Sequence, residues 1–231
     1  MALNLLMLGP PGAGKGTQAE RFARLRGIPK ISTGDILREA VHAKTEIGLR
    51  AKAIMDRGEL VSDDVMIGIV RERLERTDAK DGFVLDGFPR TVAQAVALDG
   101  IMANRGPLIV VDIVVPEAEL VRRLGTRSIC RLCGTGASVG STVGAACAKC
   151  GGRLVQRTDD NQAVVLERLK VYHRQSEPLV EYYRVRPTFR SIDGAQPPDK
   201  VAADLVAAIE AAGAGAVAIG KPVGRGSGVQ P

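Results

Sequence analysis

Short apolar runs alternate with stretches of helical periodicity along most of this chain. The apolar runs predict buried β-strands, and apolar residues spaced for one face of a helix predict the segments between them. The predicted strands are 2–8, 27–31, 83–85, 108–115 and 188–192. The predicted helices are 14–26, 33–41, 47–57, 63–76, 91–105, 117–124, 161–185 and 199–212. This alternation predicts an α/β fold with a parallel five-stranded sheet flanked by helices.

Two segments interrupt the alternation and predict insertions. Residues 32–61 contain helices without a strand, and residues 126–160 are rich in glycine and hold all four cysteines. Both are expected over the carboxyl ends of the strands, where such sheets bind ligands. The remaining parts, 1–31, 62–125 and 161–212, form the core of a single domain over 1–212. Residues 213–231, mostly Gly, Ala, Pro and basic residues, are predicted to be a disordered tail.

Composition narrows the class of ligand. The chain has 231 residues, 45% of them apolar and only 3% aromatic, with a net charge of +6. A positive balance favours an anionic ligand. The arginines occur singly within motifs and no nucleic-acid-reading motif is present, so we expect a small phosphate compound and no nucleic acid. No apolar run has the length of a membrane span or the charged front of a secretory signal, which predicts a cytoplasmic protein without a membrane partner.

The first strand is followed by the sequence Gly-Pro-Pro-Gly-Ala-Gly-Lys-Gly-Thr, residues 9–17. Glycines allow the backbone N–H groups of such a loop to converge on a phosphate, and the following helix N-terminus favours an anion. Lys15 adds a point charge on the bridging phosphate oxygens. The segment therefore predicts nucleoside triphosphate binding. Because Gly16 follows the lysine and the hydroxyl comes later, at Thr17, we expect carboxylates to hold the metal through water.

The cysteines form two short pairs. Cys130 and Cys133 are separated from Cys147 and Cys150 by thirteen residues. Each pair is a turn that directs two thiolates to one point, and two such turns complete a tetrahedral zinc site. A lobe of about 35 residues cannot build a stable core alone, so the metal would supply its folding energy. With four thiolates no position stays open for catalysis, and the predicted zinc is structural.

Three further segments allow two readings when taken alone. Residues 32–38, Ser-Thr-Gly-Asp-Ile-Leu-Arg, begin a capped helix or contribute to a site. Residues 86–90, Asp-Gly-Phe-Pro-Arg, form a turn with a surface ion pair, or place a carboxylate beside a metal-bound phosphate. Asp159 and Asp160 either cap the N-terminus of the following helix, where acids are favoured by its dipole, or belong to a site near the arginines of the cysteine lobe.

In this order the motifs resemble those of adenylate kinases of the long, lidded bacterial type. The resemblance covers about residues 1–212 and rests on residues 9–17, 32–38 and 86–90 and on Gln-Arg-Thr-Asp-Asp-Asn at 156–161. It implies transfer of the γ-phosphoryl group of MgATP to AMP, giving two ADP. It also implies a P-loop fold with a helical insertion that binds the nucleoside monophosphate, a zinc-ribbon-like lid, and a monomer.

The resemblance also implies the site residues. ATP would contact Gly12, Ala13, Gly14, Lys15, Gly16, Thr17, Arg123, Arg127 and Gln196. AMP would contact Thr33, Arg38, Glu59, Leu60, Val61, Gly87, Phe88, Pro89, Arg90, Gln94, Arg157 and Arg168. The catalytic group would be Lys15, Arg90, Arg123, Arg127, Arg157, Arg168 and Asp86. Asp86, with Asp35 behind it, would orient the waters of Mg²⁺.

One part of the chain departs from the family pattern. The loop between the cysteine pairs is shorter than is usual, and residues 134–140 contain no aromatic side chain to stack on the donor base. Donor-base discrimination should then depend on Arg123 and backbone contacts. Two other functions stay open at this point: a kinase of UMP or CMP, and a non-enzymatic zinc module that binds nucleic acid.

Overall fold

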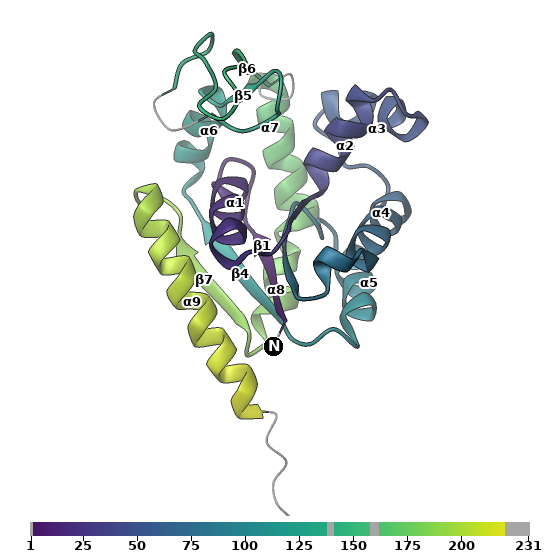
Figure 1. Cartoon of the computed structure of the whole chain (residues 1–231), viewed down its shortest axis with the longest axis vertical. Coiled ribbons are helices and arrows are strands. Elements are labelled where there is room, and N and C mark those ends of the chain that lie inside the picture. Colours follow the sequence, from purple (N-terminus) through teal and green to yellow (C-terminus); the bar gives the residue numbers. More distant parts are fainter. Residues whose placement is uncertain (1, 138–140, 158–161, 220–231) are drawn as a thin grey trace, which may run out of the picture.

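The central sheet has five parallel strands, as predicted, and their order is β2-β3-β1-β4-β7. The computed structural model describes residues 2–137, 141–157 and 162–219. The strands are β1 (Leu3–Leu8), β2 (Lys30–Ser32), β3 (Gly82–Asp86), β4 (Leu108–Val114) and β7 (Phe189–Asp193). Strand β1 lies in the middle, so the glycine-rich loop that follows it leaves from the centre of the carboxyl edge (Figure 1).

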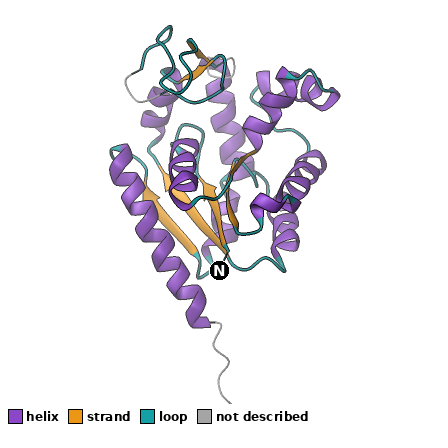
Figure 2. Cartoon of the chain, in the orientation of Figure 1, coloured by secondary structure: helices purple, strands orange, loops and turns teal. Residues whose placement is uncertain are grey.

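Alternate residues of each strand enter two separate cores. In β1, Leu5 and Met7 pack on one face, whereas Leu6 and Leu8 pack on the other. The first face is covered by α1 (Lys15–Arg26), α6 (Glu117–Gly125), α7 (Gln162–Val171) and α9 (Pro198–Ile219). The second is covered by α4 (Asp63–Glu75), α5 (Val92–Met102) and α8 (Pro178–Arg184) (Figure 2). Burial on both faces explains why the strands are continuous apolar runs in the sequence.

Two segments rise above the carboxyl edge of the sheet (Figure 1). The first holds α2 (Thr33–His42) and α3 (Glu46–Asp56), with Ser32 and Thr45 as hydroxyl N-caps. The second segment comprises residues 126–160, and we call it the lid. It carries an antiparallel pair of strands, β5 (Ser128–Cys130) and β6 (Leu154–Gln156), that the sequence pattern did not indicate. Residues 138–140 of the lid loop, and Asp159 and Asp160, lie outside the described residues.

The helix predicted over 161–185 is wrong as a single element. It is divided into α7, a π-helical turn at Tyr172–Ser176, and α8. The Glu177 N–H donates to the Tyr172 carbonyl at 2.9 Å, one residue wider than an α-helical bond. Pro178, which follows, has no N–H to donate to the helix, and this favours a break at that point. The Ser176 hydroxyl donates to the Arg90 carbonyl at 2.9 Å, which ties the turn to the end of β3.

The tail predicted from residue 213 is also wrong in part. Helix α9 continues to Ile219, beyond the expected end at residue 212. Alanines at 214, 216 and 218 favour the continuation, because alanine has the highest helix propensity, whereas Gly213 and Gly215 oppose it. Residues 220–231 are not described. Within the described part, no helix combines the length and the apolar character that crossing a bilayer would require.

Candidate active site

A cleft of about 2600 Å³ lies over the carboxyl edge, between the lid and the α2–α3 insertion. Its lining includes the glycine-rich loop, the start of α2, the end of β3 and the lid hairpin. Every site residue implied by the sequence resemblance lines this cleft except Phe88. Phe88 is 1% exposed and packs in the second core, so its side chain supports the turn from within.

The glycine-rich loop has the backbone that a phosphate cradle needs. Gly12 and Gly14 have φ values of 88° and 93°, in the left-handed region that favours glycine. Gly14 precedes α1 without a side-chain cap, and the first residues of that helix, Lys15 to Thr17, line the cleft, so their N–H groups are available to an anion there. A Cβ at Gly16 would lie 3.2 Å from Asp86 Oδ2. Glycine at this position therefore allows the carboxylate to approach the loop, where a hydroxyl side chain would displace it.

Lys15 lies in an environment that disfavours its charge. Its Nζ donates to the carbonyls of Gly9 at 2.6 Å and Pro10 at 2.9 Å. Burial lowers the pKa of Lys15 to about 8, against an opposing attraction by Asp86. Arg90, Arg168 and Arg127 contribute to the same lowering, which places these three cations within electrostatic range of Lys15. The site thus concentrates positive charge that an anionic ligand would relieve.

Asp35, on the first turn of α2, is held by two cations. Its Oδ1 accepts a hydrogen bond from Arg38, and its Oδ2 lies 3.4 Å from Lys30 Nζ. Burial alone would raise the pKa of Asp35, but Arg38 and Lys30 outweigh it and hold the pKa below its usual value. Likewise burial would lower the pKa of Lys30, but Asp35 and Glu20 raise it. Sequence reasoning missed Lys30, although a lysine beside the buried Ile31 was a detectable signal.

A hydrogen-bonded group forms the side of the cleft at the end of β3. The Thr33 hydroxyl and Arg90 Nε both donate to the Gly87 carbonyl at 2.8 Å. The Gln94 side chain accepts from the Arg90 N–H at 2.8 Å and donates to Asp63 at 2.7 Å. Asp63 was not singled out in the sequence, because an acid in the first turn of a helix normally serves the helix alone.

The lid side of the cleft carries the remaining arginines. Arg123 Nε donates to Glu119 Oε1 at 2.7 Å, one helical turn earlier on α6. Hydrogen bonds from Arg122 and Arg123 lower the pKa of Glu119 to about 2, so this carboxylate is ionised at neutral pH and accepts a hydrogen bond from Arg123. Arg127 follows α6 and Arg157 follows β6, and both line the cleft. Glu119 was also missed, since acids spaced this way usually form solvated pairs.

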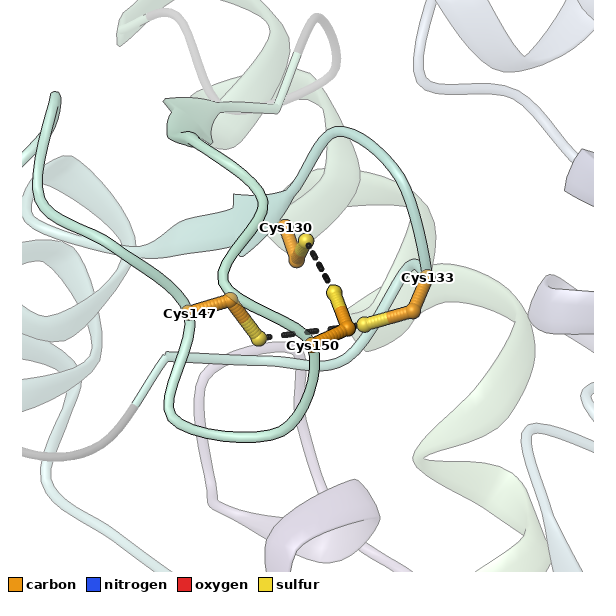
Figure 3. A group of neighbouring side chains, drawn as sticks. All are labelled: Cys130, Cys133, Cys147 and Cys150. Atoms are coloured by element: carbon orange, nitrogen blue, oxygen red, sulfur yellow. Dashed lines mark hydrogen bonds between the residues drawn. The ribbon is translucent and has the colours of Figure 1, made fainter.

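The four cysteines lie together, as the spacing predicted. All four Sγ atoms lie within 4.8 Å of one another, and Figure 3 shows the side chains directed to a common point. The Cys130–Cys150 and Cys133–Cys147 sulfur distances are 3.4 and 3.8 Å. Zinc–sulfur bonds of about 2.3 Å give a tetrahedron with edges of about 3.8 Å, so this donor set fits Zn²⁺. N–H groups of Leu132 and Lys149 point to Cys130 and Cys147 at 3.4 Å and would support the thiolates.

Comparison with known proteins gives consistent matches. The family model described as "Adenylate kinase" matches residues 7–188. A protein of Archaeoglobus fulgidus named adenylate kinase is 49% identical over 216 residues, covering 90% of this chain and 98% of the relative. One from Geobacter sp. (strain M21) is 49% identical, covering 90% and 100%, and one from Geobacillus sp. (strain WCH70) is 50% identical, covering 88% and 96%.

Proposed function

The chain belongs to the adenylate kinase family, and on that premise we propose that it reversibly transfers the terminal phosphoryl group of MgATP to AMP, giving two ADP. The observation that carries the proposal is that Lys15, on the glycine-rich loop, interacts electrostatically with Asp86 and Arg90, at and just beyond the end of β3, in one cleft. The glycine-rich loop and the Thr33–Gly87–Arg90 group both line this cleft. A donor nucleotide bound to the loop and an acceptor bound to this group would meet with their phosphates at Lys15.

The reaction needs alignment and positive charge and no protein nucleophile. A phosphate oxygen of AMP forms a bond to the γ-phosphorus of ATP while the bond from that phosphorus to the β,γ-bridging oxygen breaks, and ADP leaves. Charge on the transferring oxygens is stabilised by Lys15 and by the surrounding arginines. These arginines are Arg90, Arg123, Arg127, Arg157 and Arg168.

The two nucleotides are assigned to separate sets of residues. We assign ATP to Gly12, Ala13, Gly14, Lys15, Gly16, Thr17, Arg123, Arg127 and the backbone at Gln196. We assign AMP to Thr33, Arg38, Glu59, Leu60, Val61, Gly87, Pro89, Arg90, Gln94, Arg157 and Arg168, with Phe88 supporting from the core.

Adenylate kinases use Mg²⁺ with ATP, and bound magnesium neutralises charge on the phosphates. Asp86 would hold its waters, with Asp35 behind, because Asp86 lies against the loop at Gly16. The four cysteines would hold structural Zn²⁺ and make the lid a rigid body. Such a lid can close over the cleft and exclude water, which would otherwise compete with AMP as acceptor.

We further propose that the protein acts as a cytoplasmic monomer on small nucleotides, without a nucleic acid or membrane partner. Residues 32–61 would act as the acceptor-binding insertion and 126–160 as the lid, on a core of 1–31, 62–125 and 161–212. The separation of both segments from the sheet supports this division (Figure 1).

A coupled assay for ADP tests the function. Purified, zinc-loaded protein is given MgATP with AMP, UMP, CMP or GMP in parallel, and a diadenosine bisubstrate inhibitor is added as a control. We expect the highest kcat/KM with AMP and loss of activity with the inhibitor. Preference for UMP or CMP would assign a different acceptor. Binding of both ATP and AMP without phosphoryl transfer would contradict the proposal.

A further inference from the structure

Lys30 connects three elements next to the cleft. It is the first residue of β2, its side chain is 21% exposed, and its Nζ lies 3.2 Å from Glu20 Oε2 on α1. The same Nζ lies 3.4 Å from Asp35 Oδ2 on α2. Because Asp35 also binds Arg38, charges of alternating sign run from Glu20 through Lys30 and Asp35 to Arg38.

Arg38 is directed toward Asp35 and its own helix start. A Cβ at Gly34 would lie 3.2 Å from both Nη atoms of Arg38, so the guanidinium folds back over the first turn of α2. Glycine at position 34 makes room for this conformation. A phosphate that takes both forks of the guanidinium would compete with Asp35 for the N–H donors of Arg38.

The free-energy cost of moving Arg38 from Asp35 to a phosphate depends on which cation still neutralises the Asp35 carboxylate. Its carboxylate is 42% exposed and would remain near an incoming phosphate. Two anions at short distance repel each other strongly where water is partly excluded. Lys30 is already in contact with the other carboxylate oxygen, Oδ2, and does not need to move. Lys30 can therefore neutralise the charge of Asp35 while Arg38 binds the phosphate.

We propose that Lys30 is a positioning residue for the acceptor nucleotide: it neutralises Asp35 so that Arg38 can exchange that carboxylate for the phosphate of a nucleoside monophosphate. The inference rests on the proposed function, which assigns Arg38 to the AMP phosphate. It predicts an effect on acceptor binding alone, because the donor phosphates lie on the glycine-rich loop.

The test measures nucleotide dissociation constants by calorimetry, without Mg²⁺ and with AMP or ATP alone. Lys30→Met should weaken AMP binding about three- to tenfold, which lies within the range for residues coupled in one network, while ATP binding stays within about twofold. Lys30→Arg should keep AMP binding within about twofold. Lys52→Met is the matched control and should leave AMP binding unchanged, because Lys52 pairs with Asp56 on α3 and does not line the cleft.

A double-mutant cycle separates compensation from direct contact. In an Asp35→Asn background, Lys30→Met should have no further effect on AMP binding. An equal loss in that background would overturn the proposal, because Lys30 would then contact AMP itself. Wild-type affinity for AMP in Lys30→Met would also overturn it. If Lys30→Met does not fold by circular dichroism, Lys30→Gln takes its place with the same expectations. Wild-type protein that binds ATP but not AMP would reject the proposed function and this inference together.

Discussion

Lys15 is the residue whose ionisation should govern activity at alkaline pH. Burial brings its pKa in the free protein to about 8. We therefore expect kcat/KM for MgATP to fall as the pH rises through about 8, because this parameter reports groups of the free enzyme. Bound phosphate favours the charged ammonium, so kcat should persist to higher pH. Initial rates between pH 6 and 10 measure both.

The Lys15→Arg variant provides the control for this pH dependence. A guanidinium stays charged above pH 12, so the alkaline fall in kcat/KM should disappear even though the misplaced charge lowers kcat. If wild-type kcat/KM stays constant to pH 9.5, the lowered pKa does not govern ATP capture. If Lys15→Arg keeps the alkaline fall, another group is responsible.

Asp99 offers a residue-level test of stability away from the cleft. Its two oxygens accept from Arg186 at 2.8 and 2.6 Å and from the Tyr182 hydroxyl at 2.6 Å, which joins α5 to α8. Asp99→Ala should reduce the free energy of unfolding by about 1–3 kcal/mol, because the partners lose their acceptor in a partly buried place. Urea denaturation measures the loss. Glu46→Ala removes an exposed pair with Arg50 and should cost less than about 0.5 kcal/mol; equal losses in the two variants would contradict this account.

At the scale of elements, the lid should depend on metal for its stability. Among the described residues of the lid, the buried hydrophobic core consists of Cys130, Cys147 and Leu154, which is too small to hold the fold alone. We expect a chelator to lower the melting temperature of the lid before it affects phosphoryl transfer at lower temperature. Measuring amide hydrogen exchange of the lid and phosphoryl-transfer activity on the same samples distinguishes a loss of lid stability from a loss of catalysis. A Cys133→Ser variant should resemble the chelated protein, and unchanged lid stability after metal removal would refute a structural zinc.

The composition of the lid should also affect donor selectivity. Residues 126–160 include no aromatic residue. Base stacking on an aromatic ring contributes about 1–3 kcal/mol, so we expect a weaker preference for ATP over GTP than in adenylate kinases with an aromatic lid residue. Leu132 is 77% exposed and lines the cleft, and Leu132→Tyr should increase the preference. Rates with ATP and GTP as donors measure this preference. A wild-type preference for ATP equal to or stronger than that of kinases with an aromatic lid residue would contradict the prediction.

The elements that sequence could predict are those with a strong periodic signal. Strands β1, β3 and β4 are apolar runs because both faces of the sheet are buried. Strands β5 and β6 have only three residues each, in a glycine-rich segment, and give no such signal. The end of α9 was misplaced because two glycines concealed an alanine-rich helix. The π-helical turn depends on a shift of hydrogen-bond register that residue patterns do not record.

In the candidate site too, some residues could be predicted from the sequence and others could not. Residues within a contiguous motif, such as Lys15, Asp86 and Arg90, could be found because their spacing carries the chemistry. Lys30 was signalled only by its place beside the buried Ile31, and its partners Glu20 and Asp35 lie on other elements. Glu119 was missed because pairs spaced three or four residues apart on a helix are usually solvated. Phe88 was placed in the site by its motif, yet its side chain belongs to the core.

At the scale of the whole molecule, the cleft is larger than a typical site for one ligand. Its volume of about 2600 Å³ exceeds the range of about 300–1,000 Å³ for typical ligand sites. We therefore expect a diadenosine bisubstrate inhibitor to bring the lid and the α2–α3 insertion together. The radius of gyration from X-ray scattering should fall toward about 17 Å, the value for a compact domain of this length. The Lys15→Met variant should show no change at the same inhibitor concentration, and an unchanged wild-type radius would contradict closure.

The hydrogen bond from Ser176 to the Arg90 carbonyl would give the two proposed substrate sites a mechanical link. Helix α7 leads from the lid into the π-helical turn that carries Ser176 (Figure 1). A rotation of the lid transmitted along α7 would strain this bond and displace the loop of residues 87–90, which follows β3. Occupancy by one nucleotide should then alter the affinity for the other, and by thermodynamic reciprocity the synergy has the same size in either order of addition.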